Sequence, residues 1–310
     1  MLPEKVKLSY IQYQNILLHY LLHPNDLFLR SVIEPGDEVL IPEPSFVCYK
    51  PITRLAGGTA IPITTVAENN FKLTADELKA AITPKTKVLV LPYPNNPTGA
   101  VMTREDLEDI AEILHKTDIM VLSDEIYAEL TYGRKHVSIA EIDGMYERTV
   151  IVSGFSKSYA MTGWRLGYAC GHPDIISAMT KVHQYAIMSA PTTAQYAAIE
   201  ALRNGDSDID MMREEYNRRR IVMVKGFNDI GLDCFEPEGA FYAFPCVRSV
   251  GYTSSEFCER LLYGSKVAVI PGTAFGDCGE GFIRCSYAYS LDNINEALTR
   301  IEAFVKQKRG

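Results

Sequence analysis

Lys157 lies in a setting where its amine can do chemistry. It falls in a short polar segment, residues 154–158, directly after an apolar run at 149–152 that is typical of a buried strand. Arg165 follows eight residues later. A lysine just past a strand end can form a Schiff base with a carbonyl, and a nearby arginine can bind a phosphate through two hydrogen bonds. The pair predicts a phosphorylated aldehyde cofactor, of which pyridoxal phosphate is the obvious example.

The sequence around this lysine is more specific than the spacing. The spacing alone favours a solvated loop lysine with an unrelated arginine. Residues 152–168, however, read VSGFSKSYAMTGWRLGY, which resembles the cofactor-lysine signature of class I aminotransferases. The resemblance implies that Ser156 and Arg165 hold the cofactor phosphate. Family members often carry a further phosphate-binding serine where this chain has Gly154, so fewer donors are expected here.

A second motif, SDEIY at 123–127, follows the strand-like residues 119–122. A carboxylate at the end of a buried strand is costly to desolvate unless it is paired. Taken alone, Asp124 is favoured as a structural or capping residue. Class I aminotransferases carry the same five residues, and the resemblance implies that Asp124 binds the ring nitrogen of the cofactor. It also implies that Tyr127 contacts the phenolic oxygen.

Three further residues are assigned by the same resemblance. Asn96 lies in LPYPNNPTG at 91–99, a turn-forming run that resembles the family's NPTG motif, whose asparagine binds the phenolic oxygen. Phe46 is placed where the family stacks an aromatic ring on the cofactor, although simple core packing explains it nearly as well. Arg284 matches the arginine that binds the substrate α-carboxylate, a task that suits a guanidinium. Without that context, a surface arginine is the default.

Composition narrows the class of protein. The chain has 310 residues, of which 47% are hydrophobic and 23% charged, as in ordinary globular proteins. Its net charge of −8 argues against nucleic acid or an anionic membrane as the main partner, and no apolar run reaches transmembrane length. The seven cysteines are scattered, without Cys-x-x-Cys spacing. They predict free thiols in the cytoplasm, with no disulfide framework and no metal site.

The order of predicted elements indicates an α/β fold. Strand-like and helical segments alternate from residue 26 to 208, which predicts a mostly parallel sheet with helices on both faces. The motifs lie at the carboxyl ends of the strands, where such sheets bind ligands. Residues 209–310 predict a smaller α+β domain that opens with a long helix. Residues 1–25 carry no motif, but their apolar side chains between Tyr10 and Tyr20 are spaced as on a helix face.

The resemblance covers about residues 26–304 and implies the type I fold of pyridoxal phosphate enzymes, in a homodimer. One departure concerns the residues just before 26. There the family carries a Thr-x-Gly-x-x-Glu-Ala turn whose amides bind the phosphate, but residues 18–25 lack the glycine. We expect weaker cofactor binding, because the turn that binds the phosphate is altered. We also expect a looser dimer, because this segment normally packs between subunits in the family.

The implied reaction moves an amino group from an L-amino acid to a 2-oxo acid. Lys157 holds the cofactor as an aldimine and then moves the proton between Cα and the cofactor's C4′. Two alternatives stay open. One is a pyridoxal phosphate-dependent β-lyase of the same fold, and the other is a catalytically impaired homologue with a structural or binding role.

Overall fold

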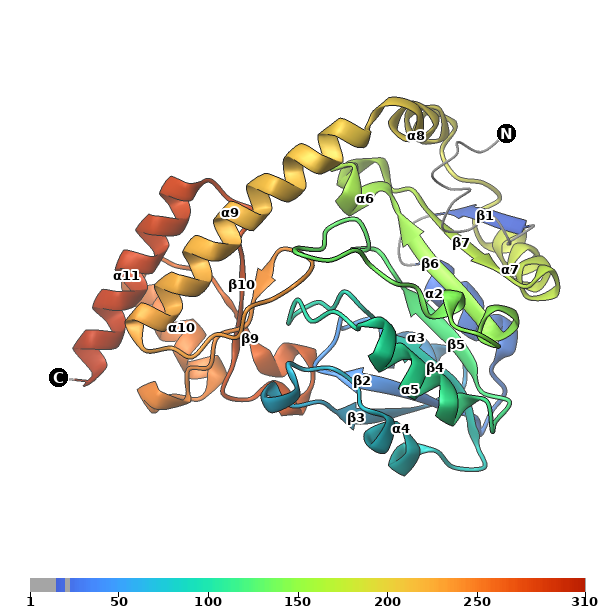
Figure 1. Cartoon of the computed structure of the whole chain (residues 1–310), viewed down its shortest axis with the longest axis horizontal. Coiled ribbons are helices and arrows are strands. Elements are labelled where there is room, and N and C mark those ends of the chain that lie inside the picture. The colour runs from blue at the N-terminus through green and yellow to red at the C-terminus, as the bar shows by residue number, and fades with distance from the viewer. Residues whose placement is uncertain (1–14, 20–22, 310) are drawn as a thin grey trace.

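The computed structural model describes residues 15–19 and 23–309. Figure 1 shows a large unit built on a twisted sheet and a smaller unit beside it, with the long helix α9 (Asp206–Ile230) running between them. The predicted division into 1–25, 26–208 and 209–310 remains an interpretation. The helix α9 begins three residues before the boundary that we placed at 209.

The large unit contains a seven-stranded sheet in the order β1-β7-β6-β5-β4-β2-β3. Strands β2 to β6 pair in parallel, whereas β7 runs antiparallel to β6 and β1 runs antiparallel to β7. The strands are β1 (Asn15–His19), β2 (Glu38–Glu43), β3 (Thr59–Thr64), β4 (Thr86–Leu91), β5 (Met120–Asp124), β6 (Thr149–Gly154) and β7 (Gly167–Gly171). The predicted mostly parallel sheet is confirmed.

Helices cover both faces of this sheet because successive strand residues point to opposite sides. In β4, Val88 and Val90 pack with α2, α3 and α7, whereas Leu89 and Leu91 pack with α4 and α5. Parallel strands buried on both faces carry such continuous apolar runs. These helices are α2 (His23–Val32), α3 (Tyr49–Leu55), α4 (Ala75–Ala81), α5 (Arg104–Leu114) and α7 (Pro173–Ala186).

Local hydrogen bonds fix where several helices begin. Thr74 and Thr103 accept hydrogen bonds from the backbone N–H groups of Glu77 and Asp106, whose carboxylates accept from the threonine N–H groups in return. These are the capping boxes that start α4 and α5. The remaining elements of the large unit are α6 (Phe155–Ser158), α8 (Thr192–Asn204), η1 (Ala67–Asn69), η2 (Ile139–Glu141), η3 (Tyr146–Arg148) and η4 (Thr162–Trp164).

The small unit packs helices against a three-stranded antiparallel sheet in the order β8-β10-β9. Its apolar core includes Phe257, Ile283, Tyr287 and Ile301 and takes in the second half of α9. Its elements are β8 (Tyr242–Ala243), η5 (Arg248–Val250), α10 (Ser254–Ser265), β9 (Ile270–Pro271), η6 (Gly272–Phe275), η7 (Asp277–Gly279), β10 (Ile283–Ser286) and α11 (Leu291–Arg309).

One sequence expectation was wrong. Residues 15–19 form a strand rather than one face of a helix, because they pair with β7 from Asn15–Gly171 to His19–Gly167. Pairing with the edge of the sheet therefore decides the conformation of this segment, and the helical spacing of its apolar residues does not. The other helix-spaced residues of this segment, Tyr10, Tyr13 and Tyr20, lie outside the described residues. Among the described helices, none combines the length and apolarity that crossing a membrane requires.

Candidate functional site

The predicted site residues meet at the carboxyl edge of the large sheet. Strands β4, β5 and β6 are neighbours and run parallel. Asn96 follows β4, Asp124 ends β5, and Lys157 lies on α6 directly after β6. Because parallel strands end at the same edge, residues that are distant in sequence are brought together there.

Asp124 is buried, with 9% of its surface exposed. Its Oδ2 accepts hydrogen bonds from the Asn25 amide at 2.9 Å and from the Tyr49 hydroxyl at 2.8 Å, while Oδ1 accepts from the Ile126 N–H at 3.3 Å. Burial raises the pKa of the Asp124 carboxyl, and the Asn25 and Tyr49 hydrogen bonds oppose that rise. The carboxylate is therefore held in place by fixed donors on three elements.

Lys157 points its amine toward two aromatic rings. Its Nζ lies 5.5 Å from the ring centroid of Phe241 and 5.8 Å from that of Tyr127. Burial lowers the pKa of Lys157, and the nearby cations Arg165 and Arg284 lower it further. A lysine with a lowered pKa has more neutral amine near pH 7, which is the nucleophilic form.

Ser156 and Arg165 flank this lysine. Ser156 is 1% exposed, and its buried Oγ has no hydrogen-bond partner among the described residues. Arg165 has a left-handed backbone, with φ of 55°, and donates from Nη1 to the Thr162 carbonyl at 2.8 Å. A buried hydroxyl without a partner is costly, so Ser156 marks a place where an acceptor is expected to bind.

A chain of contacts joins the two units. The hydroxyls of Tyr127 and Tyr242 lie 3.0 Å apart. The Arg284 guanidinium carbon lies 4.6 Å from the ring centroid of Tyr242 and 4.8 Å from that of Phe275. Arg284 also donates from Nη1 to the Asn96 side-chain oxygen at 3.0 Å. The small unit therefore presents a cation at the edge where the large unit presents Asn96, Tyr127 and Lys157.

Phe46 lies at the margin of this cluster. Its ring meets Tyr49 edge-on, with centroids 6.4 Å apart at 80°, and it also lines a cavity of about 250 Å³ between the β2–α3 loop and η6. It packs against the core as a half-buried side chain. Core packing and cofactor stacking therefore both remain compatible with its position.

Sequence reasoning missed three residues that contact the predicted set: Asn25, Tyr49 and Tyr242. Asn25 lies in the segment where we found no motif. Tyr49 is the first residue of α3, and Phe46 lies in the loop before that helix, so helical spacing from Phe46 gave no signal for it. Within residues 15–19 and 23–309, no group of His, Cys, Asp and Glu side chains is arranged to hold a metal ion.

Comparison with known proteins decides the family. The model of the family "Aminotransferase class I and II" matches residues 23–301. The chain is a class I/II aminotransferase. It is 51% identical to the putative aminotransferase YugH of Bacillus subtilis over 280 residues, which cover 90% of this chain and 72% of that protein. It is 46% identical to an aspartate aminotransferase of Pyrococcus abyssi over 91% of this chain and 73% of that protein.

A solved structure supports the same family. The aromatic aminotransferase from Pyrococcus horikoshii matches with a TM-score of 0.96 at 42% identity, over 99% of this chain and 84% of that one. The predicted resemblance and the predicted fold are therefore confirmed, and the chain is an enzyme of amino-group transfer. Residues 18–25, where we expected the glycine-containing turn to be missing, include residues 20–22, which lie outside the described residues. The expected weaker cofactor binding and looser dimer stay predictions.

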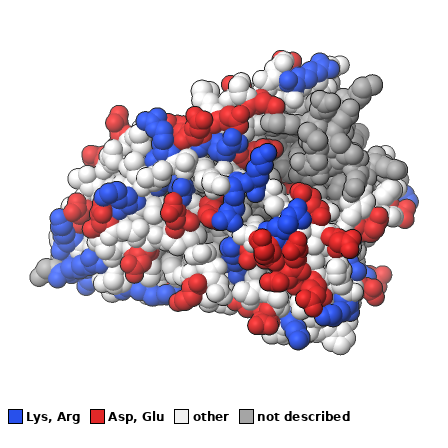
Figure 2. Space-filling model, viewed as in Figure 1, with Lys and Arg blue, Asp and Glu red and all other residues white. Residues whose placement is uncertain are grey.

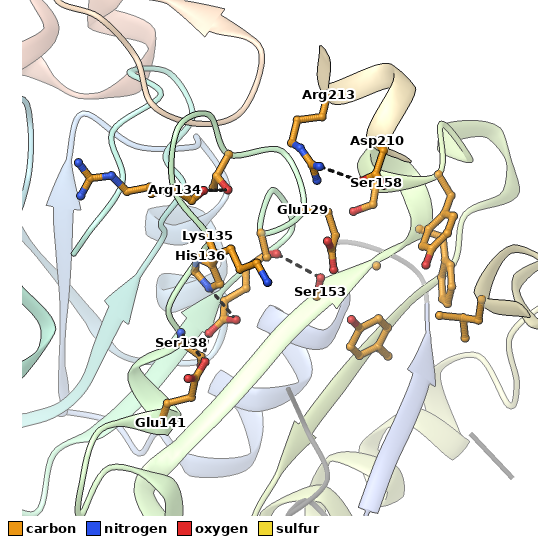
Figure 3. Close-up of a pocket in the computed structure, with 18 of the residues that line it drawn as sticks. Glu129, Arg134, Lys135, His136, Ser138, Glu141, Ser153, Ser158, Asp210 and Arg213 are labelled. Carbon is orange, nitrogen blue, oxygen red and sulfur yellow. Dashed lines mark hydrogen bonds and ion pairs between the residues drawn. The ribbon is translucent and has the colours of Figure 1, made fainter. Parts of the chain in front are cut away.

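A further cavity of about 740 Å³, drawn in Figure 3, is lined by none of the predicted site residues. Its lining includes Glu125 and Ser158, the sequence neighbours of Asp124 and Lys157. His136, from the loop after β5, makes an ion pair at 2.9 Å with the buried carboxylate of Glu125. Ser138 and Ser123 donate to the same carboxylate at 2.6 Å and 2.9 Å. Burial disfavours the imidazolium, but Glu125 outweighs it and raises the pKa of His136. Burial likewise opposes ionisation of Glu125, yet His136 and the two serines lower its pKa.

The substitution Tyr49→Phe should reduce turnover without loss of fold. It removes one donor from Asp124, and a hydrogen bond to a charged group contributes about 1.5–3 kcal/mol. We expect kcat to fall about tenfold to a hundredfold, measured in steady-state transamination. Tyr263→Phe is the control, because Tyr263 is exposed on α10. Unchanged kcat in Tyr49→Phe would show that this hydroxyl does not matter to the carboxylate's function.

The substitution His136→Gln should destabilise the enzyme in a pH-dependent way. Breaking a buried pair costs about 3–5 kcal/mol. The pKa of His136 is higher in the folded protein than in the unfolded chain, where it is about 6.5. Its contribution to the free energy of unfolding is therefore complete below pH 6.5 and is lost as the pH rises through the folded pKa. The pKa of Glu125 is lower in the folded protein than in the unfolded chain, where it is about 4.3. Its contribution to the free energy of unfolding is therefore complete above pH 4.3 and is lost as the pH falls through the folded pKa.

Urea unfolding of wild type and His136→Gln between pH 5 and 9 tests this dependence. The gap between their midpoints should be largest near pH 5–6 and should shrink at alkaline pH. His172→Gln is the control, since its ion pairs with Glu147 and Asp174 are both long, at 3.7 Å, and exposed. A gap that stays constant across this pH range contradicts the assigned charges.

Proposed function

We propose that this aminotransferase uses pyridoxal phosphate to move an amino group between an L-amino acid and a 2-oxo acid. The observation that carries the proposal is the meeting, at one sheet edge, of a lysine with a lowered pKa, a buried carboxylate and an arginine aimed at Asn96. A nucleophilic amine, an anion and a carboxylate-binding cation are the groups that this reaction needs.

The side chains fit the cofactor. The unpartnered Oγ of Ser156 and the guanidinium of Arg165 would hold the phosphate. Asp124 would bind the protonated ring nitrogen, and Asn96 and Tyr127 the phenolic oxygen. Pyridoxal phosphate, when bound, supplies an aldehyde carbon that reacts with amines and a ring that withdraws electrons.

The chain's own residues do the rest. The Lys157 amine, kept partly neutral by burial and by Arg165, takes the proton from the substrate Cα as a general base and returns it as a general acid. The Asp124 carboxylate holds a proton on the ring nitrogen by charge. Arg284 orients the substrate carboxylate, so that the Cα–H bond faces Lys157 rather than water.

Transamination is favoured over the β-lyase alternative, because the matched relatives are named aminotransferases. Product analysis separates the two, since a lyase yields pyruvate and ammonia. A catalytically impaired homologue would show no transamination, and visible absorbance of a lysine-bound cofactor in the purified protein would argue against that alternative.

A homodimer and a cytoplasmic location are also proposed. Aromatic and aliphatic side chains are exposed from the end of α7 to α8: Tyr185 at 94%, Met188 at 81% and Tyr196 at 71%. Apolar patches of this kind mark protein interfaces. The location rests on cysteine usage, since each of the seven cysteines is a free thiol.

The substitution Lys157→Ala should abolish transamination, because no other amine would bond to the cofactor or carry the Cα proton. Borohydride reduction followed by peptide mass analysis should label Lys157 in wild type and nothing in the variant. Lys79→Ala, at an exposed position of α4, should behave as wild type. Turnover by Lys157→Ala with a different lysine labelled would refute the assignment.

The substitution Asp124→Asn should cut the rate far more than it cuts cofactor binding. The amide keeps an acceptor for Asn25 and Tyr49 but removes the charge that favours the ring proton. We expect kcat to fall at least a hundredfold, with the dissociation constant for pyridoxal phosphate in equilibrium dialysis changing by about tenfold or less. Wild-type kcat would mean that Asp124 does not face the ring.

A further inference from the structure

We propose that Tyr242 is a positioning residue that fixes two binding groups at once, the guanidinium of Arg284 and the hydroxyl of Tyr127. The inference rests on the proposed function and adds a residue that neither the sequence motifs nor the matched names single out. Its ring and its hydroxyl have separate tasks, so the two parts can be tested separately.

The ring of Tyr242 is placed against Arg284 by strand pairing. Tyr242 in β8 lies opposite Ser286 in β10. Arg284, two residues before Ser286 on the same strand, therefore projects from the same face. The guanidinium carbon lies 4.6 Å from the Tyr242 ring centroid and contacts Phe275 as well, at 4.8 Å. Two rings thus fix the plane of the guanidinium, and the bond to Asn96 fixes its direction.

The hydroxyl of Tyr242 is placed against Tyr127. The two oxygens lie 3.0 Å apart, and the rings meet edge-on with centroids 5.9 Å apart. Burial raises the pKa of both phenols, so both keep their protons at neutral pH. Only one proton can lie between the two oxygens. If Tyr242 donates it, the Tyr127 proton is left to donate to the phenolic oxygen of the cofactor.

The backbone before Tyr242 is held firmly enough for such a task. Ala240 is fully buried and adopts the left-handed conformation, with φ of 58°, which is costly for a residue with a side chain. Its N–H donates to the Leu130 carbonyl at 2.9 Å, and its carbonyl accepts from the hydroxyls of Tyr132 and Tyr287. Hydrogen bonds to Leu130 and Tyr132 of the large unit and to Tyr287 of the small unit therefore hold Ala240 in its strained conformation.

Tyr242 consequently links the substrate end of the site to its cofactor end. It belongs to the small sheet through β8, yet its hydroxyl meets a residue of the large unit. Losing the ring should loosen Arg284 and weaken substrate binding. Losing the hydroxyl alone should leave Arg284 in place and change only the environment of the phenolic oxygen.

The test compares Tyr242→Phe and Tyr242→Leu with wild type, using L-aspartate and L-phenylalanine as amino donors and 2-oxoglutarate as acceptor. For Tyr242→Phe, we expect both KM values within about threefold of wild type and kcat lowered about two- to tenfold. The pH at which the visible absorbance of the lysine-bound cofactor changes should rise by about 0.3–1 unit. For Tyr242→Leu, both KM values should rise by about three- to thirtyfold.

Tyr216→Phe is the control, because its ring contacts Phe241 at 5.5 Å but its hydroxyl is not part of the Tyr127 or Arg284 contacts. If Tyr242 has only a structural role, the substitutions lower the stability of the protein, the pH of the absorbance transition does not change, and kcat and KM do not respond differently in the two variants. That result overturns the proposal. If Tyr242→Leu does not fold, an unshifted absorbance transition in Tyr242→Phe overturns it alone. Failure of the proposed function is distinct, since wild type would then show neither absorbance nor transamination.

Discussion

The carboxylate of Asp124 is removed from water at the end of a central strand, where an unpaired negative charge is costly. Much of the large unit is arranged around that constraint. Helix α2 supplies Asn25, helix α3 supplies Tyr49, and the turn after β5 supplies a backbone N–H. Each of these neutral donors satisfies part of the hydrogen-bonding capacity of the carboxylate and leaves its negative charge in place. The charge is therefore left for a cationic ligand, which the protonated ring of the cofactor would be.

Two arginines at the site affect the pKa of Lys157. Burial lowers that pKa, and the positive charges of Arg165 and Arg284 lower it further. Their influence depends on what is bound, because a phosphate beside Arg165 or a carboxylate beside Arg284 would cancel part of their charge. Lys157 is then more basic with both anions in place than without them. On the proposed assignment, the amine would be nucleophilic when the site is open and a better proton acceptor when the substrate is bound, in the order that transamination needs.

The sequence predicted the parts of the aminotransferase that depend on local pattern. Asn96, Asp124 and Lys157 were placed at strand ends from apolar runs, and parallel pairing brings such ends together. Tyr49 and Tyr242 were missed because their contacts cross 75 and 115 residues of sequence. The strand at 15–19 was missed because its partner, β7, follows some 150 residues later. Long-range pairing and side-chain direction are decided by tertiary packing, which periodicity does not encode.

The distance between the two ends of the site is set by main chain rather than by side chains. The Gly99 carbonyl, in the turn that carries Asn96, accepts hydrogen bonds from the N–H groups of Glu238 and Gly239 at 3.0 Å and 2.9 Å. A Cβ added at Gly99, where φ is 76°, would lie 2.4 Å from Cβ of Pro237. Only glycine permits this approach. Because the turn of Asn96 and the segment leading to Tyr242 are joined backbone to backbone, Arg284 meets Asn96 at a separation that side-chain motion alone would not preserve.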